Sequence, residues 1–515
     1  MLSSPYNLHA MELFHSSDFQ SHVDDLMVEH HVPGLAIAIV QNETTASAGY
    51  GKSSLQPPKT CTADTLFDIA SASKSLTAAS VALLVNDEKY PEVQWEATMS
   101  SLLPGEFEIP GVTVEDILSH RSGMPSSSYD DSYLGVRAAK PDTAQSVTRN
   151  LRHLTCSAPI RSKYMYCNMM YTVATYLVEK KTGLSFSDFL EHHFFQPLDM
   201  RSSSLQPERA RSKGLGDRIA TGYNWKEDIK EYGDGFQTPD CPEAQGAGSI
   251  ITSVNDYIKW VKVVMDHQDP ITDNVYKGLL KQRISQNPDA EDLRPLTSPT
   301  MYGAGWEIFY YRGHQVVSHD GLVQGFGSTH FFLPDFKFGG AIFGNSDAAG
   351  EIALILMREL IDEVLKVPHS ERPDWTKIES DLYPENNDNN IDDKIAKLRQ
   401  KMCPGIQESE PQKMPLCNYT GEYWNPGYHG MTVQIKDDKL FINAADRSFG
   451  FTVRFDHVCQ QSKYIAHLSG VLDGGDEPLK AEFIFNNNRV VRMGLYLEDE
   501  LEDLIWFDKV EEHSD

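Results

Sequence analysis

Ser71 and Lys74 have the residue types and the spacing of a catalytic pair, because they lie three residues apart in the segment Ser71-Ala-Ser-Lys74. Residues three apart share one face of a helix, so the lysine amine can lie beside the serine hydroxyl. A serine becomes a nucleophile when a nearby base takes its proton, and burial can lower the pKa of a lysine enough for this role. A helix N-terminus would also favour a developing oxyanion. The pair therefore suits acyl transfer, although a solvated face of an ordinary helix has the same spacing.

Tyr166 and Asn168 are candidate partners of this pair. They flank Cys167 just before a helix predicted over residues 172–181, so both side chains can turn toward one cleft. A tyrosine can shuttle a proton if an adjacent cation lowers its pKa. An asparagine amide can orient a lysine or a substrate carbonyl. The alternative interpretation is an aromatic core segment with a helix-capping asparagine.

A third polar segment contains His319 and Gly321, and it follows a strand-like run over residues 315–318. We expect a polar break between strands at this point. His319 is a candidate for handling a proton or orienting a ligand. A lone histidine at the end of a strand is equally often a structural residue.

The elements that must position these residues begin and end with strands. The first part of the chain predicts a helix over residues 17–31, strands at 35–40 and 46–50, and a strand ending at residue 70 before a helix that starts near Ser71. Residues 71–267 are mainly helical. Strands return at 305–311, 315–318, 327–332 and 339–344, before a helix over 349–366. We therefore expect the two ends of this region to combine into one sheet with helices on both faces, and the serine to lie where the sheet meets the helical region.

Composition limits the classes of function. A chain of 515 residues exceeds what one core usually serves, so we expect one large and one small domain. The formal net charge of -28 argues against nucleic acid or an anionic membrane surface as a partner. No HExxH, GxxxxGKS/T or GxSxG motif supports a zinc peptidase, a P-loop enzyme or an α/β-hydrolase. We expect a small-molecule substrate and neither a metal nor a cofactor.

The cysteines and the apolar runs give evidence on the subcellular location of the protein. The seven cysteines are scattered, without CxxC pairs or the spacing of metal ligands, so we expect reduced thiols. The N-terminal residues lack the pattern of a secretory leader, and no apolar run has the length of a membrane span. These features predict a cytoplasmic protein.

The last part of the chain has a different periodicity. Residues 367–415 are polar, with a mobile loop expected at 386–390 and a connecting helix at 391–402. An antiparallel meander is predicted by strand-like runs at 419–424, 431–436, 439–444, 449–455, 464–468, 481–485, 490–497 and 504–507.

Taken together, the three polar segments resemble those of the serine β-lactamase and penicillin-binding-protein superfamily, above all its class C β-lactamase, carboxylesterase and D-aminopeptidase branch. Ser71-Ala-Ser-Lys74 resembles the SxxK motif, Tyr166-Cys-Asn168 the YxN motif, and His319-Asp-Gly321 the place of the KTG motif, which is often HxG in esterases and peptidases. The similarity covers roughly residues 15 to 366. The meander resembles the lipocalin-like C-terminal barrel of some members.

This resemblance implies a fold and a division into domains. The fold is an α/β (α+β) serine β-lactamase-like transpeptidase fold, with an antiparallel sheet, helices on both faces and a helical subdomain, followed by a smaller all-β lipocalin-like barrel. The domains are a catalytic domain over residues 1–366, a polar linker over 367–415 and the barrel over 416–515. We favour a filled barrel that packs against the catalytic domain and shapes its entrance, or mediates a homodimer contact.

The resemblance also implies roles for single residues. Ser71 would form the acyl-enzyme, Lys74 and Tyr166 would exchange its proton, and Asn168 would orient them. His319 would occupy the place of the family's substrate-facing lysine, next to Gly321. The oxyanion hole would be the backbone N–H groups of Ser71 and Leu322. Cys167 replaces the usual serine of the middle motif, which matters little if it faces inward. A histidine at position 319 removes a permanent cation, so efficient antibiotic hydrolysis is not expected.

The activity implied is that of a serine hydrolase acting on an ester, or less readily an amide or lactone, of a small-molecule metabolite, with secondary metabolism as its setting. An acyltransferase that uses the same acyl-enzyme is one alternative. A D-aminopeptidase-like peptidase and a non-catalytic scaffold on this fold are the others.

Overall fold

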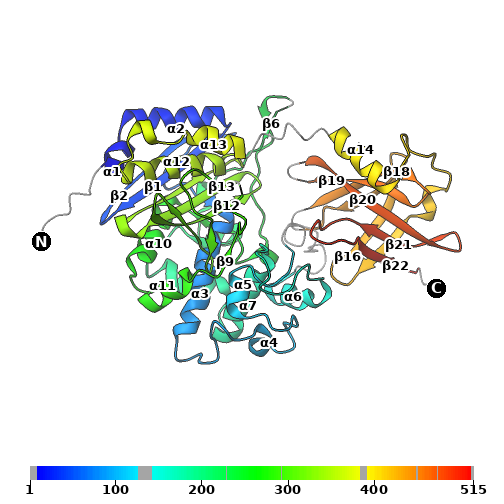
Figure 1. Ribbon diagram of the computed structural model, residues 1–515, viewed down its shortest axis with the longest axis horizontal. Helices are drawn as coiled ribbons and strands as arrows, with labels where there is room; N and C mark the ends of the chain where they lie inside the picture. The colour runs from blue at the N-terminus through cyan, green and yellow to red at the C-terminus, as the bar shows by residue number, and fades with distance from the viewer. Residues whose placement is uncertain are drawn as a thin grey trace, which may run out of the picture.

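The computed structural model describes residues 9–125, 142–227, 229–291, 293–382, 391–447, 450–471 and 474–511. Figure 1 shows two parts side by side: a larger body of helices around a sheet, coloured blue to yellow, and a barrel of strands coloured orange to red. The loop expected at residues 386–390 lies outside the described residues.

The larger part is built on a nine-stranded antiparallel sheet in the order β3-β2-β1-β14-β13-β12-β11-β10-β9. Its strands are β1 (Gly34–Gln41), β2 (Thr44–Leu55), β3 (Pro58–Thr60), β9 (Ile284–Ser285), β10 (Met301–Tyr302), β11 (Glu307–Tyr311), β12 (His314–Val323), β13 (Phe326–Leu333) and β14 (Phe338–Gly344). Strand β1 pairs with β14 from Leu35↔Gly344 to Gln41↔Phe338. The two ends of this region therefore meet in one sheet, as the sequence predicted.

Two apolar cores lie on opposite faces of this sheet, because side chains alternate along each strand. The odd-numbered residues 35–39 of β1 pack with α1 (His9–Phe14), α2 (Ser17–Glu29) and α12 (Ala349–Val364). The even-numbered residues 36–40 pack with α10 (Val254–Asp266) and the helical region. That region contains α3 (Lys74–Asn86), α4 (Met99–Leu102), α5 (Val114–Leu118), α6 (Ala144–Asn150), α7 (Met169–Thr182), α8 (Phe186–Leu190), α9 (Pro207–Ser212) and α11 (Asp273–Leu280). The prediction of helices on both faces is confirmed.

The polar break expected around His319 is wrong, because β12 continues through it. The strand pairs with β13 from Val317↔Phe332 to Val323↔Phe326. Its polar side chains have partners inside the fold: Nδ1 of His319 lies 2.7 Å from the Asp320 carbonyl oxygen, and Thr329 Oγ1 donates to Asp320 Oδ1 at 2.5 Å. Internal hydrogen bonding lets a polar segment occupy a strand in the middle of the sheet.

The smaller part is a closed antiparallel barrel of eight strands, which confirms the predicted meander. The strands are β15 (Gly421–Asn425), β16 (His429–Lys436), β17 (Lys439–Ala444), β18 (Phe451–Cys459), β19 (Lys463–Gly470), β20 (Gly474–Asn486), β21 (Arg489–Leu495) and β22 (Ile505–Lys509). Aromatic side chains pack inside it: the rings of Tyr419, Tyr464 and Phe483 have centroids between 5.1 and 5.7 Å apart. These three rings fill the part of the barrel interior in which they lie.

A helix and a disulfide are attached to the barrel. Helix α14 (Ile391–Met402) packs on β19 and β20, and Cys403, just beyond its end, is bonded to Cys459 of β18. The expectation that all thiols are reduced is therefore wrong. The two cysteines lie 56 residues apart in the sequence, and only the fold brings their Cα atoms to 6.8 Å. No helix among the described residues is long and apolar enough to cross a membrane.

An ionic bridge crosses three neighbouring barrel strands. His467 of β19 places Nδ1 2.8 Å from Oδ1 of Asp476 in β20, and Nε2 3.4 Å from Oδ2 of Asp456 in β18. Lys439 and Arg454 also face Asp456. The hydrogen bond to Asp456 is the main reason that the pKa of His467 is raised above its usual value, and Asp476 adds to it, while burial opposes it. The bridge therefore favours the imidazolium form.

We predict that this bridge makes barrel stability depend on pH. The imidazolium contributes fully below the unfolded pKa of about 6.5, and its contribution is lost as the pH rises through the raised pKa of the folded state. His467→Gln should lower the free energy of unfolding by about 1 to 2 kcal/mol near pH 6 and by less near pH 9. Denaturant unfolding at both pH values measures this difference. His457→Gln is the matched control, because Nδ1 of His457 lies 2.9 Å from the Glu410 carbonyl oxygen and its ring packs on Tyr464, and it forms no ion pair with a carboxylate among the described residues. A pH-independent loss in His467→Gln would contradict the assignment.

Candidate active site

Ser71 lies on a tight turn that follows the short strand β4 (Phe67–Asp68). The chain forms a 3-10 turn, η1 (Ala70–Ser73), and α3 begins only at Lys74, so the helix starts slightly later than the sequence predicted. Ala70 has a positive φ of 45°, which is a strained backbone conformation for a residue with a Cβ. Its N–H donates to Asp68 Oδ1 at 2.9 Å, and burial raises the pKa of Asp68 to about 6. This turn presents the Ser71 hydroxyl at the end of the sheet.

The amine of Lys74 is fully buried and lies among three acceptors. Nζ donates to Ser71 Oγ at 2.8 Å, to Asn168 Oδ1 at 2.5 Å and to the Ala247 carbonyl oxygen at 2.9 Å. The serine and the lysine are therefore hydrogen-bonded, as their spacing predicted. Asn168 immediately precedes α7, so that helix brings its amide to the lysine.

Tyr166 completes this group. Its hydroxyl donates to Ser71 Oγ at 2.7 Å, and Lys74 Nζ lies 4.6 Å from the centre of its ring. Ser71 Oγ thus has two hydrogen-bonding partners through which it can lose a proton. Cys167 is buried, as expected for a residue that points away from the cleft. The structure brings all four predicted residues together, and their catalytic roles stay predictions.

His120 also belongs to the site, although none of the three sequence motifs contains it. Its Nδ1 accepts the N–H of Cys167 at 3.0 Å, and its ring stacks on that of Tyr166 with centroids 4.2 Å apart. Burial, and then the charge of Lys74, hold the pKa of His120 well below its usual value. The neutral ring therefore supports Tyr166 without adding a second cation beside Lys74.

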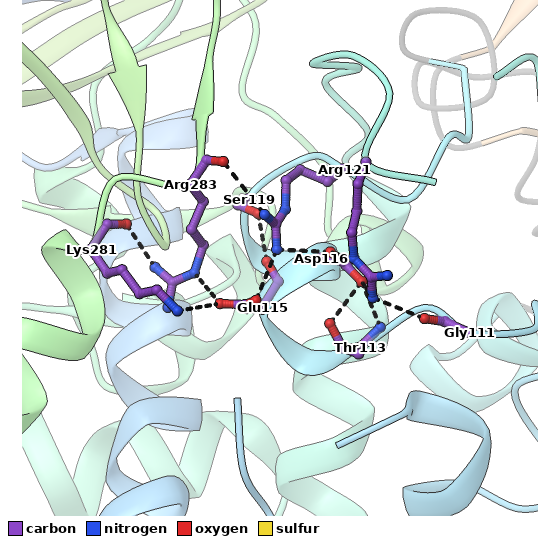
Figure 2. Close-up of polar contacts among 9 residues, drawn as sticks. Gly111, Thr113, Glu115, Asp116, Ser119, Arg121, Lys281 and Arg283 are labelled. Carbon is purple, nitrogen blue, oxygen red and sulfur yellow. Dashed lines mark hydrogen bonds and ion pairs between the residues drawn. The ribbon is translucent and has the colours of Figure 1, made fainter. Parts of the chain in front are cut away.

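A buried ionic network anchors the segment that carries His120 (Figure 2). Asp116, fully buried in α5, contacts Arg121 NH2 at 2.8 Å and Arg161 NH2 at 2.5 Å. The Arg161 N–H in turn donates to the Arg121 carbonyl oxygen at 2.8 Å. Arg283 adds a contact from Nε to Glu115 Oε2 at 3.1 Å. This network joins α5 to the loop that leads to Tyr166, so it helps to fix the tyrosine relative to the serine.

Strand β12 lies directly against the turn that carries Ser71. At Gly321 a Cβ would lie 2.1 Å from the Ile69 carbonyl oxygen, so only glycine fits this approach. Ser328 of β13 donates to the same carbonyl at 2.9 Å. Leu322 follows, and both it and Ser71 line one cavity. The proposed oxyanion hole at their N–H groups stays a prediction.

His319 belongs to the same strand, and its side chain is buried. It is not among the described residues that line the cavity. Its Nε2 lies 2.8 Å from the Tyr302 hydroxyl. With Nδ1 directed at a carbonyl oxygen, Nε2 is the acceptor of the tyrosine hydrogen. Burial, and then the charge of Lys74, lower the pKa of His319 to about 3. His319 is therefore neutral, and its contact with substrate stays a prediction.

The cavity at Ser71 has a volume of about 610 Å³, in the range of small-molecule sites. Its described lining residues come from both parts of the chain. They include four carboxylates and no lysine or arginine: Asp68, Asp347, Asp476 and Glu477. Among the described residues, no three His, Cys, Asp or Glu side chains gather as a metal site would require.

Comparison with known proteins agrees with this geometry. Residues 19–359 match the family model described as "Beta-lactamase". The chain belongs to the beta-lactamase family. Residues 407–509 match a second model, described as a domain of unknown function, DUF3471. In this beta-lactamase-family chain, the barrel therefore corresponds to a domain without an assigned role.

Curated relatives cover most of the chain. It is 31% identical over 506 residues to "Unguisins hydrolase ungD'" of Aspergillus campestris, covering 96% of this chain and 91% of the relative. It is 32% identical over 460 residues to "Unguisins hydrolase ungD" of Aspergillus violaceofuscus, covering 83% and 77%. Among solved structures, the octameric penicillin-binding protein homologue from Pyrococcus abyssi has a TM-score of 0.58 at 20% identity, covering 95% and 99%. The last likeness shows the fold alone.

We predict that Ser71→Ala reduces acyl-bond hydrolysis by about a million-fold, because the nucleophile is lost. Tyr166→Phe keeps the ring that stacks on His120 and removes only the hydroxyl, so turnover should fall by about a hundredfold or more. Tyr164→Phe is the matched control, because that hydroxyl bonds to Gln286 and not to Ser71. Steady-state turnover of an activated ester measures all three. Near-native turnover in Tyr166→Phe would refute its role in proton transfer.

We also predict that Gly321→Ala impairs the site, since β12 and η1 must separate to admit the methyl group. The free energy of unfolding should fall by about 1 to 3 kcal/mol, and turnover should fall with it. Gly350→Ala is the control, because a Cβ there would meet only Leu322 Cδ1, at 4.0 Å. Denaturant unfolding and ester turnover give the two readouts. Equal behaviour of the two variants would show that the close approach at Gly321 is unimportant.

Proposed function

We propose that this chain is a hydrolase that forms an acyl-enzyme at Ser71 and releases the acyl group to water. One observation carries the proposal: Ser71 Oγ lies 2.8 Å from Lys74 Nζ and 2.7 Å from the Tyr166 hydroxyl, at the wall of a cavity large enough for a small molecule. A scaffold protein has no need for a fully buried lysine directed at a serine, because an amine can be buried only where several acceptors are arranged around it.

The proposed reaction has two halves. Oγ of Ser71 bonds to the substrate carbonyl carbon while its proton passes through the hydrogen bonds to Tyr166 and Lys74. The bond to the leaving group then breaks, and the leaving group departs with that proton. Water next attacks the acyl ester, gives up a proton through the same bonds, and the free acid leaves as Ser71 regains its hydrogen. Asn168 holds the lysine amine in place during both halves.

The charge of the cavity indicates the class of substrate. Four carboxylates among the described lining residues, with a neutral His319 behind them, disfavour a substrate that carries its own carboxylate. A penicillin is such an anion, so we expect it to be a poor substrate. We propose a neutral or cationic ester or amide. Two relatives named unguisins hydrolases match most of this chain and support a hydrolytic reaction.

We predict that the protein hydrolyses an unguisin and that Ser71→Ala does not. Mass spectrometry of the reaction mixture should show products whose combined mass exceeds that of the substrate by one water for each bond broken. A neutral activated ester and one penicillin extend the panel, with the ester turned over faster. Turnover that persists in Ser71→Ala would refute the proposal. Transfer of the acyl group to an added alcohol or amine in excess of hydrolysis would favour the acyltransferase alternative instead.

A further inference from the structure

One open end of the barrel faces Ser71. Four strand connections lie at this end, because the paired strand ends Asn425↔His429, Ala444↔Phe451, Gly470↔Gly474 and Leu495↔Ile505 belong to the same rim. Residues 450 and 451 of one connection, and residues 470 and 474–477 of another, line the cavity together with Ser71. The barrel therefore closes the cavity with its mouth, not with its outer surface.

The connection between β15 and β16 attaches this rim to the larger part of the chain. Asn150 Nδ2, at the end of α6, donates to the Gly427 carbonyl oxygen at 2.9 Å. A Cβ at Gly427 would lie 2.5 Å from the side-chain atom Leu154 Cδ2 and 3.2 Å from the His153 carbonyl oxygen, so the glycine lies close against residues 153 and 154. Figure 1 shows α6 beside β16 at this junction. The contact sets the distance between the mouth of the barrel and Ser71.

The hairpin of β19 and β20 projects at this open end of the barrel and forms one wall of its mouth. Strand β20 pairs with β21 only from Ala481 onward, whereas it pairs with β19 from Gly474. Its first residues therefore extend beyond β21 and are paired on one side only. The bridge through His467 ties this extension to β19 and β18. That bridge makes the hairpin a fixed wall, which a specific contact with substrate requires.

The side chains of this wall that face inward are apolar or acidic. In β18, Phe451 and alternate residues after it are buried, which marks the inner face of the barrel. Leu468 and Glu477 are directly paired across β19 and β20, so they share one face and both line the cavity. Across the cavity from the barrel, the Leu322 side chain is 65% exposed. An exposed leucine beside a nucleophile calls for an apolar ligand.

We infer that the mouth of the barrel is a substrate subsite, in which Leu468 and Leu322 bind an apolar, uncharged group of the acyl compound while its carbonyl lies at Ser71. This inference rests on the proposed function and assigns a role to the C-terminal domain. Leu468 is a specificity-determining residue from the barrel. The carboxyl group of Glu477 at the same rim disfavours the entry of anionic groups.

The test compares three neutral esters in the full-length protein by following acid release. Methyl acetate is too short to reach the barrel, whereas hexyl acetate and methyl heptanoate are isomers that carry an apolar chain on either side of the reacting bond. The native protein should prefer at least one of the longer esters, measured as kcat/KM relative to methyl acetate. Leu468→Trp should reduce that preference by about tenfold, because the mouth is filled, and should leave methyl acetate within about twofold.

Two further variants complete the test. Leu468→Ala removes the apolar contact without adding bulk, so it should also lower the preference, and it decides the outcome if the tryptophan variant does not fold. Ile435→Trp, on an exposed position of β16, should change nothing. A native protein without preference for either longer ester, or a preference that survives both Leu468 variants, overturns the inference alone. Failure of an activated ester to acylate Ser71, seen by intact mass, overturns the proposed function and the subsite with it.

Discussion

The buried amine of Lys74 is the constraint on which the site depends. Taking an amine out of water is costly unless its hydrogens find acceptors, and here they reach Ser71, Asn168 and the Ala247 carbonyl oxygen. These acceptors come from the turn η1, the start of α7 and the turn before β8 (Ile250–Thr252). Satisfying one side chain therefore requires three distant segments to meet. The nucleophile is positioned by the same contacts that make the buried lysine tolerable.

The sheet explains why those segments can be so far apart in the sequence. Strand β1 pairs with β14, so the helical region is inserted between strands of one sheet. Strand β12, which follows this region in the sequence, lies against η1. The sequence predicted this closure from apolar runs at both ends, and it predicted the barrel strands from alternation and turn residues. The spacing of Ser71 and Lys74 predicted them as neighbours, and the resemblance to a known family added Tyr166 and Asn168 to the same site.

Other features depend on contacts that leave no local pattern. His120 sits in a segment whose visible signals are those of a short helix, yet its ring stacks on Tyr166 only in the fold. Cys403 and Cys459 show no paired spacing, since the barrel alone brings them together. The polarity of residues 318–320 indicates a break, but Thr329 and Tyr302 come from other strands to satisfy them. Each miss reflects a tertiary partner that overrides a local preference.

Electrostatics connects the two parts of the molecule. His319 is neutral and adds no cation to the site, and the barrel adds Asp476 and Glu477 to the carboxylates Asp68 and Asp347. Apart from the Lys74 amine, which is bonded to Ser71, the site offers an anion no lysine or arginine among its described lining residues, so selection must come from shape and apolar contact. The mouth of the barrel can supply both, because the barrel is closed and the His467 bridge holds the projecting part of β20 to β19 and β18. A closed barrel therefore gives the entrance a rigidity that a loop would lack.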